Sequence, residues 1–77
     1  MSIQLRRVIN TISVIPFPIR LNQGYRNTRF SSIRKGIILL SLKMTTFSTD
    51  IPAVQVLTPN GMFLIFEEDF YERTEIA

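Results

Sequence analysis

The sequence predicts an α+β, β-rich fold: a small antiparallel sheet or barrel of about four strands, one N-terminal amphipathic helix and a C-terminal β-hairpin. Three observations support this prediction. The first residues show a helical spacing of apolar side chains, the middle of the chain carries a long apolar run, and a Pro-Asn-Gly turn separates two further apolar runs. We expect residues 1–77 to form a single small domain, because 77 residues have room for one core only.

The segment LRRVINTISVI, residues 5–15, predicts the helix. Its apolar residues recur at i, i+3, i+4, i+7 and i+10 and would share one helical face: Leu5, Val8, Ile9, Ile12 and Ile15. Val14 breaks this pattern, and the many β-branched side chains of the segment favour a strand. We nevertheless expect a helix here, packed across the sheet or projecting from it, with its end at Pro16.

The segment GIILLSLKMTTF, residues 36–47, predicts a buried strand. Its first half is a run of apolar residues with too few polar side chains for a surface element. In its second half Leu40, Leu42 and Met44 alternate with Ser41 and Lys43, which is the period of a strand.

The segment AVQVLTPNGMFLIFEE, residues 53–68, predicts a hairpin. Pro59 presets φ for the first turn position, Asn60 tolerates the second, and Gly61 can take the left-handed conformation that closes a three-residue loop. The runs 54–58 and 62–66 would then pair antiparallel.

Both faces of this hairpin are apolar, which a sheet covered on one face only would not need. Either the helix covers one face and a partner covers the other, or the hairpin lies deep in a small barrel. We expect the hairpin to form an interface through four residues: Phe63, Ile65, Val54 and Val56. The acidic tail that follows suits a short helix, because Glu67, Glu68 and Asp69 would lie in its first turn.

A core of this size usually needs additional stabilisation. The chain has no Cys for a disulfide and no His, so ordinary zinc or copper ligation is excluded, and we expect no metal and no cofactor. Hydrophobic residues make up 45% of the sequence, and the mean hydropathy is +0.19. We therefore expect a homo-oligomer or a member of a larger complex.

The net charge of +3 conceals a strong segregation of charge. Residues 1–49 carry eight basic residues and no acid, whereas residues 50–77 carry six acids and Arg73. A basic half of this kind can bind phosphates, contact the acidic half of another copy, or be neutralised within the folded chain.

The segment YRNTRFSSIRKG, residues 25–36, is the candidate for phosphate binding. Arg26, Arg29, Arg34 and Lys35 could contact phosphates, and the interleaved aromatic side chains of Tyr25 and Phe30 could stack on bases. The sequence therefore predicts a non-enzymatic interaction subunit that binds an acidic partner, either nucleic acid (RNA or DNA), which we prefer, or an acidic protein surface. In the competing interpretation the two aromatic residues point into the core and the arginines pair with the acidic tail.

Two other functions remain open. The chain could be a structural subunit of a virion or another large complex that associates through its apolar hairpin. Alternatively, the acid-free N-terminal part resembles a mitochondrial presequence in composition, with a cut between Phe30 and Ser31. For the location of the protein, we expect the cytoplasm in preference to the mitochondrion.

The sequence offers no catalytic machinery. Without His and Cys, no ordinary nucleophile and base can be paired, and the acidic tail matches no calcium-binding loop. We therefore expect no enzyme activity. No membrane span is expected, because the apolar runs are far shorter than the about 20 residues that a spanning helix needs.

Overall fold

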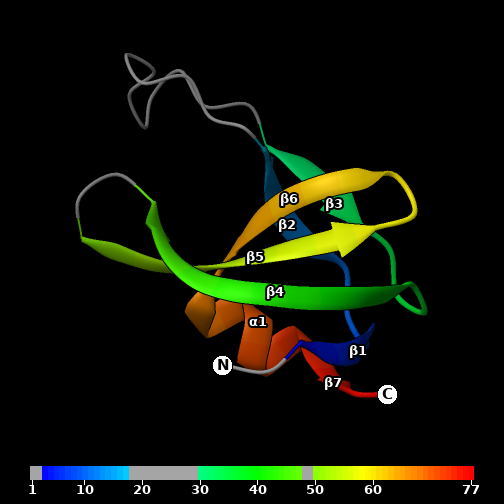
Figure 1. The fold of residues 1–77 in the computed structure, drawn as a ribbon. Coiled ribbons are helices and arrows are strands. Elements are labelled where there is room, and N and C mark those ends of the chain that lie inside the picture. Colours follow the sequence, from blue (N-terminus) through cyan, green and yellow to red (C-terminus); the bar gives the residue numbers. More distant parts are fainter. Residues whose placement is uncertain (1–2, 18–29, 48–49) are drawn as a thin grey trace.

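The computed structural model describes residues 3–17, 30–47 and 50–77 (Figure 1). In these ranges the chain forms seven strands and one short helix. The elements are β1 (Gln4–Val8), β2 (Ile12–Pro16), β3 (Ser31–Ile33), β4 (Ile38–Phe47), β5 (Ile51–Thr58), β6 (Gly61–Phe66), α1 (Glu67–Arg73) and β7 (Thr74–Ile76).

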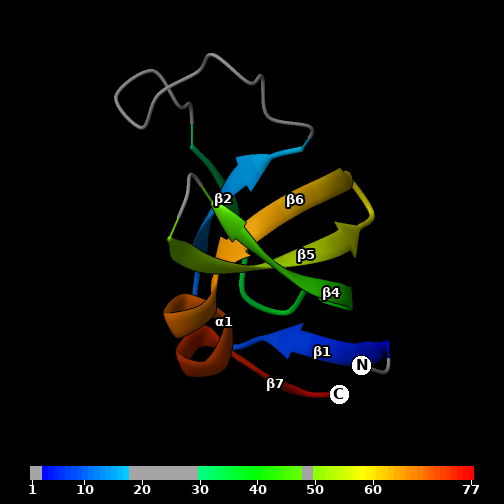
Figure 2. The same cartoon turned by 60° about the vertical axis from the view of Figure 1, so that its left-hand side comes forward.

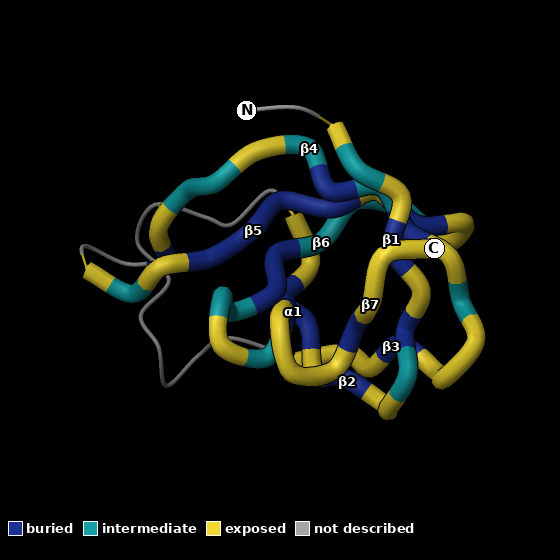
Figure 3. The backbone as a smooth tube through the Cα atoms, turned by 90° about the horizontal axis from the view of Figure 1, so that it is seen from below, coloured by how far each residue is buried: buried dark blue, intermediate teal, exposed yellow. Residues whose placement is uncertain are grey.

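The strands form one antiparallel sheet in the order β3-β2-β6-β5-β4-β1-β7. The sheet curls into a half-barrel, and its inner face encloses most of the core (Figures 1 and 3). Figure 2 shows α1 below β5 and β6, beside β1 and β7. The predicted sheet of about four strands is therefore wrong: the described residues contain seven strands.

The predicted N-terminal helix is also wrong, because its residues form β1 and β2. Arg6 and Val8 are buried in β1, and Ile12 and Val14 are buried in β2, so the inward side chains follow a period of two. Leu5, which began the predicted helical stripe, is 52% exposed. Val14, the residue that broke the helical pattern, fits the alternating pattern of the strand and is fully buried. The β-branched side chains of the segment favour the extended conformation that it adopts.

The C-terminal hairpin is present as predicted. β5 pairs with β6 from Ala53 opposite Phe66 to Thr58 opposite Gly61. The register leaves two residues in the loop where three were predicted, and Gly61 has the expected positive φ of +125°. The hydroxyl of Thr58 accepts a hydrogen bond from the Asn60 amide (3.1 Å), which fixes the turn.

The buried side chains form two clusters on opposite faces of the sheet. The larger cluster fills the inner face: Val8, Ile12, Val14, Ile33, Leu39, Val54, Val56, Ile65 and Phe70. The smaller cluster lies on the outer face and consists of Ile15, Phe47, Ala53 and Leu64. Figure 3 shows buried residues concentrated along β5 and β6 in the middle of the sheet.

The acidic tail forms the predicted short helix α1, with Glu67, Glu68 and Asp69 in its first turn. Phe70 is 3% exposed and is the residue by which α1 joins the inner core. The helix ends where β7 begins, and β7 pairs with β1, so the two ends of the described chain lie side by side.

Candidate interaction surfaces

The predicted phosphate-binding residues fall into two groups. Tyr25, Arg26 and Arg29 lie outside the described residues. Arg34 and Lys35 lie in the turn between β3 and β4, and both are exposed. The described ion pairs involve Arg7 and Arg73 and leave Arg34 and Lys35 without an acidic partner among the described residues.

Backbone hydrogen bonds hold this turn against the end of β1. The Gly36 amide donates to the Val8 carbonyl (2.7 Å), and the Val8 amide donates to the Ile37 carbonyl (2.9 Å). A weaker bond of 3.4 Å from the Ile37 amide to the Arg34 carbonyl closes the turn itself. Gly36 has a φ of +97°, a conformation that side chains disfavour. The two cations therefore sit on a short, anchored turn.

The same end of β1 also receives the C-terminus of α1. The Ile9 amide donates to the Arg73 carbonyl (2.8 Å), directly after the Val8 contacts with the turn. Arg73 in turn donates to the Thr11 carbonyl (3.1 Å) and lies 3.8 Å from the Asp69 carboxylate. Arg73 therefore carries its own counter-charge, whereas the neighbouring turn does not.

Phe30, the predicted stacking residue, has an intermediate position. The residue is 44% exposed, and its ring meets Phe66 edge-on, with centroids 6.1 Å apart and an interplanar angle of 71°. Phe66 also contacts Phe47 at 5.8 Å. Phe30 thus packs on Phe66 at the outer face and is still a partly exposed residue.

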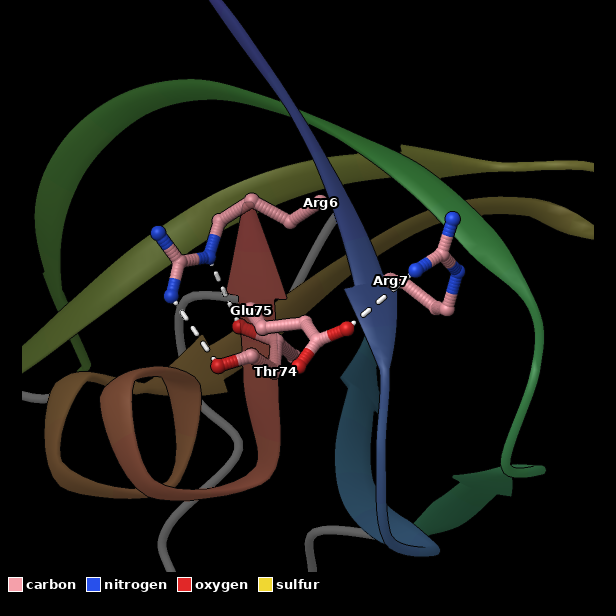
Figure 4. A network of polar contacts seen from close by, with 4 residues as sticks. All are labelled: Arg6, Arg7, Thr74 and Glu75. Carbon is pink, nitrogen blue, oxygen red and sulfur yellow. Dashed lines mark hydrogen bonds and ion pairs between the residues drawn. The ribbon is translucent and has the colours of Figure 1, made fainter. Parts of the chain in front are cut away.

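Arg6 and Arg7 form a polar network with the C-terminal strand that sequence reasoning missed. Figure 4 shows the two side chains leaving β1 on opposite sides. On one side, Arg6 donates from Nε to the Thr74 hydroxyl (2.8 Å) and from Nη2 to the Thr74 carbonyl (3.0 Å). On the other side, Arg7 pairs with Glu75 at 3.2 Å. Arg7 and Glu75 confirm one internal neutralisation between the basic and acidic parts of the chain.

The Arg6 guanidinium is buried without a carboxylate partner among the described residues. The residue is 7% exposed, and its third donor bond goes from Nη1 to the Gln4 side chain (3.0 Å). Its charge lies over the Phe70 ring at 4.5 Å and near the Tyr71 ring at 5.8 Å. The aromatic faces supply the negative electrostatic surface that a carboxylate would otherwise provide. Arg6 therefore fastens β1 to α1 and β7.

The four predicted interface residues belong mainly to the core of the chain itself. Val54, Val56 and Ile65 are at most 1% exposed, and Phe63 packs partly buried against them. The curl of the sheet turns this side of the hairpin inward, so these three side chains offer no surface to a partner in this fold.

Among the described residues no three His, Cys, Asp or Glu side chains come together as a metal site, and no described helix has the length and apolarity to cross a membrane. Comparison with protein-family models, with curated proteins and with solved structures found no match to this chain.

Proposed function

We propose that this protein is a non-enzymatic interaction subunit that binds nucleic acid through the turn at Arg34 and Lys35. The observation that supports the proposal is the contrast within the basic half. Arg6 and Arg7 are engaged with the C-terminal strand, while Arg34 and Lys35 are exposed and have no acidic partner among the described residues.

The anchored turn favours phosphate binding for two reasons. When cations without a protein counter-ion contact phosphates, they displace the counter-ions that are condensed on the nucleic acid. The release of these ions drives association. In addition, the hydrogen bonds to Val8 fix the turn before binding, so less conformational entropy is lost in the complex. Phe30 directly precedes β3 and is 44% exposed as a residue, and a base that stacks on it would add to the phosphate contacts.

Charge reversal tests the proposal. We expect the double variant Arg34→Glu/Lys35→Glu to bind a labelled single-stranded oligonucleotide at least tenfold more weakly, and its salt slope to fall by about 2. The measurement is fluorescence anisotropy between about 50 and 200 mM salt, with circular dichroism to confirm that the variant is folded.

Lys43→Glu is the matched control. Lys43 is exposed on β4, and its reversal changes the net charge as much as Lys35→Glu does. We expect Lys43→Glu to leave the salt slope unchanged, while Lys35→Glu alone lowers it by about 1. If the double variant keeps the affinity and slope of the unmodified chain, or if the unmodified chain does not bind the oligonucleotide at low salt, the proposal is wrong.

A further inference from the structure

Four apolar residues form a continuous row across the outer face of the sheet. The register places Leu5 opposite Leu40, Leu40 opposite Leu57, and Leu57 opposite Met62, on the adjacent strands β1, β4, β5 and β6. We call Leu5, Leu40, Leu57 and Met62 the outer row. Because directly paired residues share a face, the four side chains lie in one line across the strands.

The outer row remains accessible in the folded chain. Leu5 is 52% exposed and Leu57 is 40% exposed, while Leu40 and Met62 are partly buried. Ile38, two residues before Leu40 on the same face, is 39% exposed. An antiparallel sheet with one face toward water normally carries polar side chains there, so this apolar line is a candidate for contact with a partner.

A buried glutamine holds one end of the row in place. Gln55 lies on the outer face beside Leu57, is 8% exposed, and donates from Nε2 to the Met62 sulfur at 2.7 Å. The thioether of Met62 is therefore positioned by a polar contact beside the row, and this flexible side chain stays in line with Leu57.

The charges beside the row are basic or already neutralised. Lys43 lies opposite Gln55 on the pair next to the row, is exposed, and has no ion pair among the described residues. On the other side Arg7 lies opposite Ile38, and Glu75 satisfies it. The charge free to meet a partner next to the row is therefore positive, which an acidic partner complements.

The size and spacing of the row argue for a slender occupant. The four side chains of the outer row together with Ile38 offer far less than the about 800 Å² per partner that a stable interface between folded proteins buries. Neighbouring strands are about 4.8 Å apart, which is close to the about 5.4 Å rise of one helical turn. A helix lying across the strands could therefore bring one apolar side chain per turn against each strand, whereas the same-face repeat of an extended peptide, about 6.7 Å, falls out of step.

From these observations we propose that the outer row is a docking site for an acidic amphipathic helix of a partner protein. The apolar stripe of the helix packs on Leu5, Leu40, Leu57 and Met62, and an acidic residue beside the stripe pairs with Lys43. This surface is separate from the turn at Arg34 and Lys35, so the proposal does not depend on nucleic-acid binding.

The test uses the full chain and two synthetic peptides. One peptide carries Leu at positions i, i+4, i+7 and i+11 with Glu at most other positions, and the second has the same composition in scrambled order. The peptides are titrated into the isotope-labelled chain, and the amide chemical shifts are followed by NMR. We expect the ordered peptide to bind at least tenfold more tightly than the scrambled one, with the largest amide shifts in residues 38–42 and 55–58. Leu57→Thr, which suits a strand, should weaken binding about tenfold, and Lys43→Gln about threefold.

Ile76→Thr is the matched control, because Ile76 is 65% exposed on β7 and lies outside the row. It should leave the affinity for the ordered peptide unchanged. Equal binding of both peptides, shifts confined to other residues, or unchanged affinity in Leu57→Thr would overturn the proposal. A homodimer that Leu57→Thr dissociates, without any binding of the ordered peptide, would also overturn it in favour of a second copy as the occupant.

Discussion

The chain contains two adjacent pairs of basic residues, Arg6-Arg7 and Arg34-Lys35, and the fold uses them differently. The first pair lies within β1, where Arg6 is buried under α1 and Arg7 pairs with Glu75. The second pair lies on the turn before β4, exposed to solvent. Two short stretches of nearly the same composition therefore make contacts within the chain in one place and leave an available charge in the other.

The difference arises from the backbone that carries each pair. Successive residues of a strand point to opposite faces, so β1 sends one arginine inward and the other outward. The inward arginine reaches Thr74 and the Phe70 ring, which provide hydrogen bonds and a favourable electrostatic surface. A turn has no inner face of this kind, so Arg34 and Lys35 both stay in water. Basic residues counted along a sequence thus overstate the charge that a partner can use.

Removing Arg6 is the variant with the largest expected effect on this comparison. Arg6→Ala removes two donors to Thr74 and the contact with Phe70, and leaves the Thr74 carbonyl without this partner. We expect the free energy of unfolding to fall by about 3 kcal/mol, from the unpaired polar group and the lost cation–π contact. Urea unfolding followed by circular dichroism measures this change.

Arg6→Lys separates the charge from the geometry. Lysine keeps the positive charge but cannot donate in the planar fork that reaches both Thr74 oxygens. We expect it to recover less than half of the lost stability. If Arg6→Ala costs less than about 0.5 kcal/mol, the limit for ordinary surface substitutions, then Arg6 is no more structural than Arg34 and the comparison fails.

The hairpin was predictable because its signal is local, whereas the rest of the sheet depends on distant partners. Pro59, Asn60 and Gly61 specify the turn by their own backbone preferences. The partners of β1 are β4 and β7, more than thirty residues away in each case. Nothing within LRRVINTISVI reveals these partners, so the chance agreement with helical spacing outweighed the β-branched side chains.

A β-bulge explains why the faces of β4 were not predictable. Leu40, Leu42 and Met44 alternate along the sequence and would share a face in a regular strand. In the structure the register shifts between Ser41 and Lys43, so Leu40 lies opposite Leu57 on the outer face and Met44 opposite Val54 on the inner face. One inserted residue reverses the face of every residue beyond it. The outer row therefore has no signature in the sequence.

The candidate site was predictable in part. The turn residues Arg34 and Lys35 were identified as part of YRNTRFSSIRKG, from its basic residues and interleaved aromatic side chains, and the structure leaves both exposed. Their anchor on Val8 was hidden, because it requires β1 to be a strand. The roles of Arg6 and Thr74 were hidden for the same reason, since 68 residues separate them along the chain.

Substituting Gly36 tests the anchored turn with an intermediate effect. Gly36→Ala meets no atom within 4 Å, so its cost comes from the φ of +97°, and we expect a loss of about 1–2 kcal/mol of stability. Gly61→Ala is the matched control, because Gly61 has a φ of +125° and equally open surroundings. Both variants should be less stable, but Gly36→Ala alone should also weaken oligonucleotide binding, by about threefold. Equal binding by the two variants would separate the turn geometry from the proposed function.

Removing Arg7, the exposed member of the first pair, has the smallest expected effect. Its ion pair with Glu75 spans 3.2 Å between side chains that are 47% and 51% exposed, so water and salt screen most of the attraction. We expect Arg7→Ala to cost less than about 1 kcal/mol, and a double-mutant cycle with Glu75→Ala to give a coupling of about 0.2–1 kcal/mol that declines in high salt. A coupling well above that range, unchanged by salt, would mean that Arg7 shares the structural role of Arg6. The positive charge of Arg7 would then not be available to a partner, because the Arg7–Glu75 pair could not open.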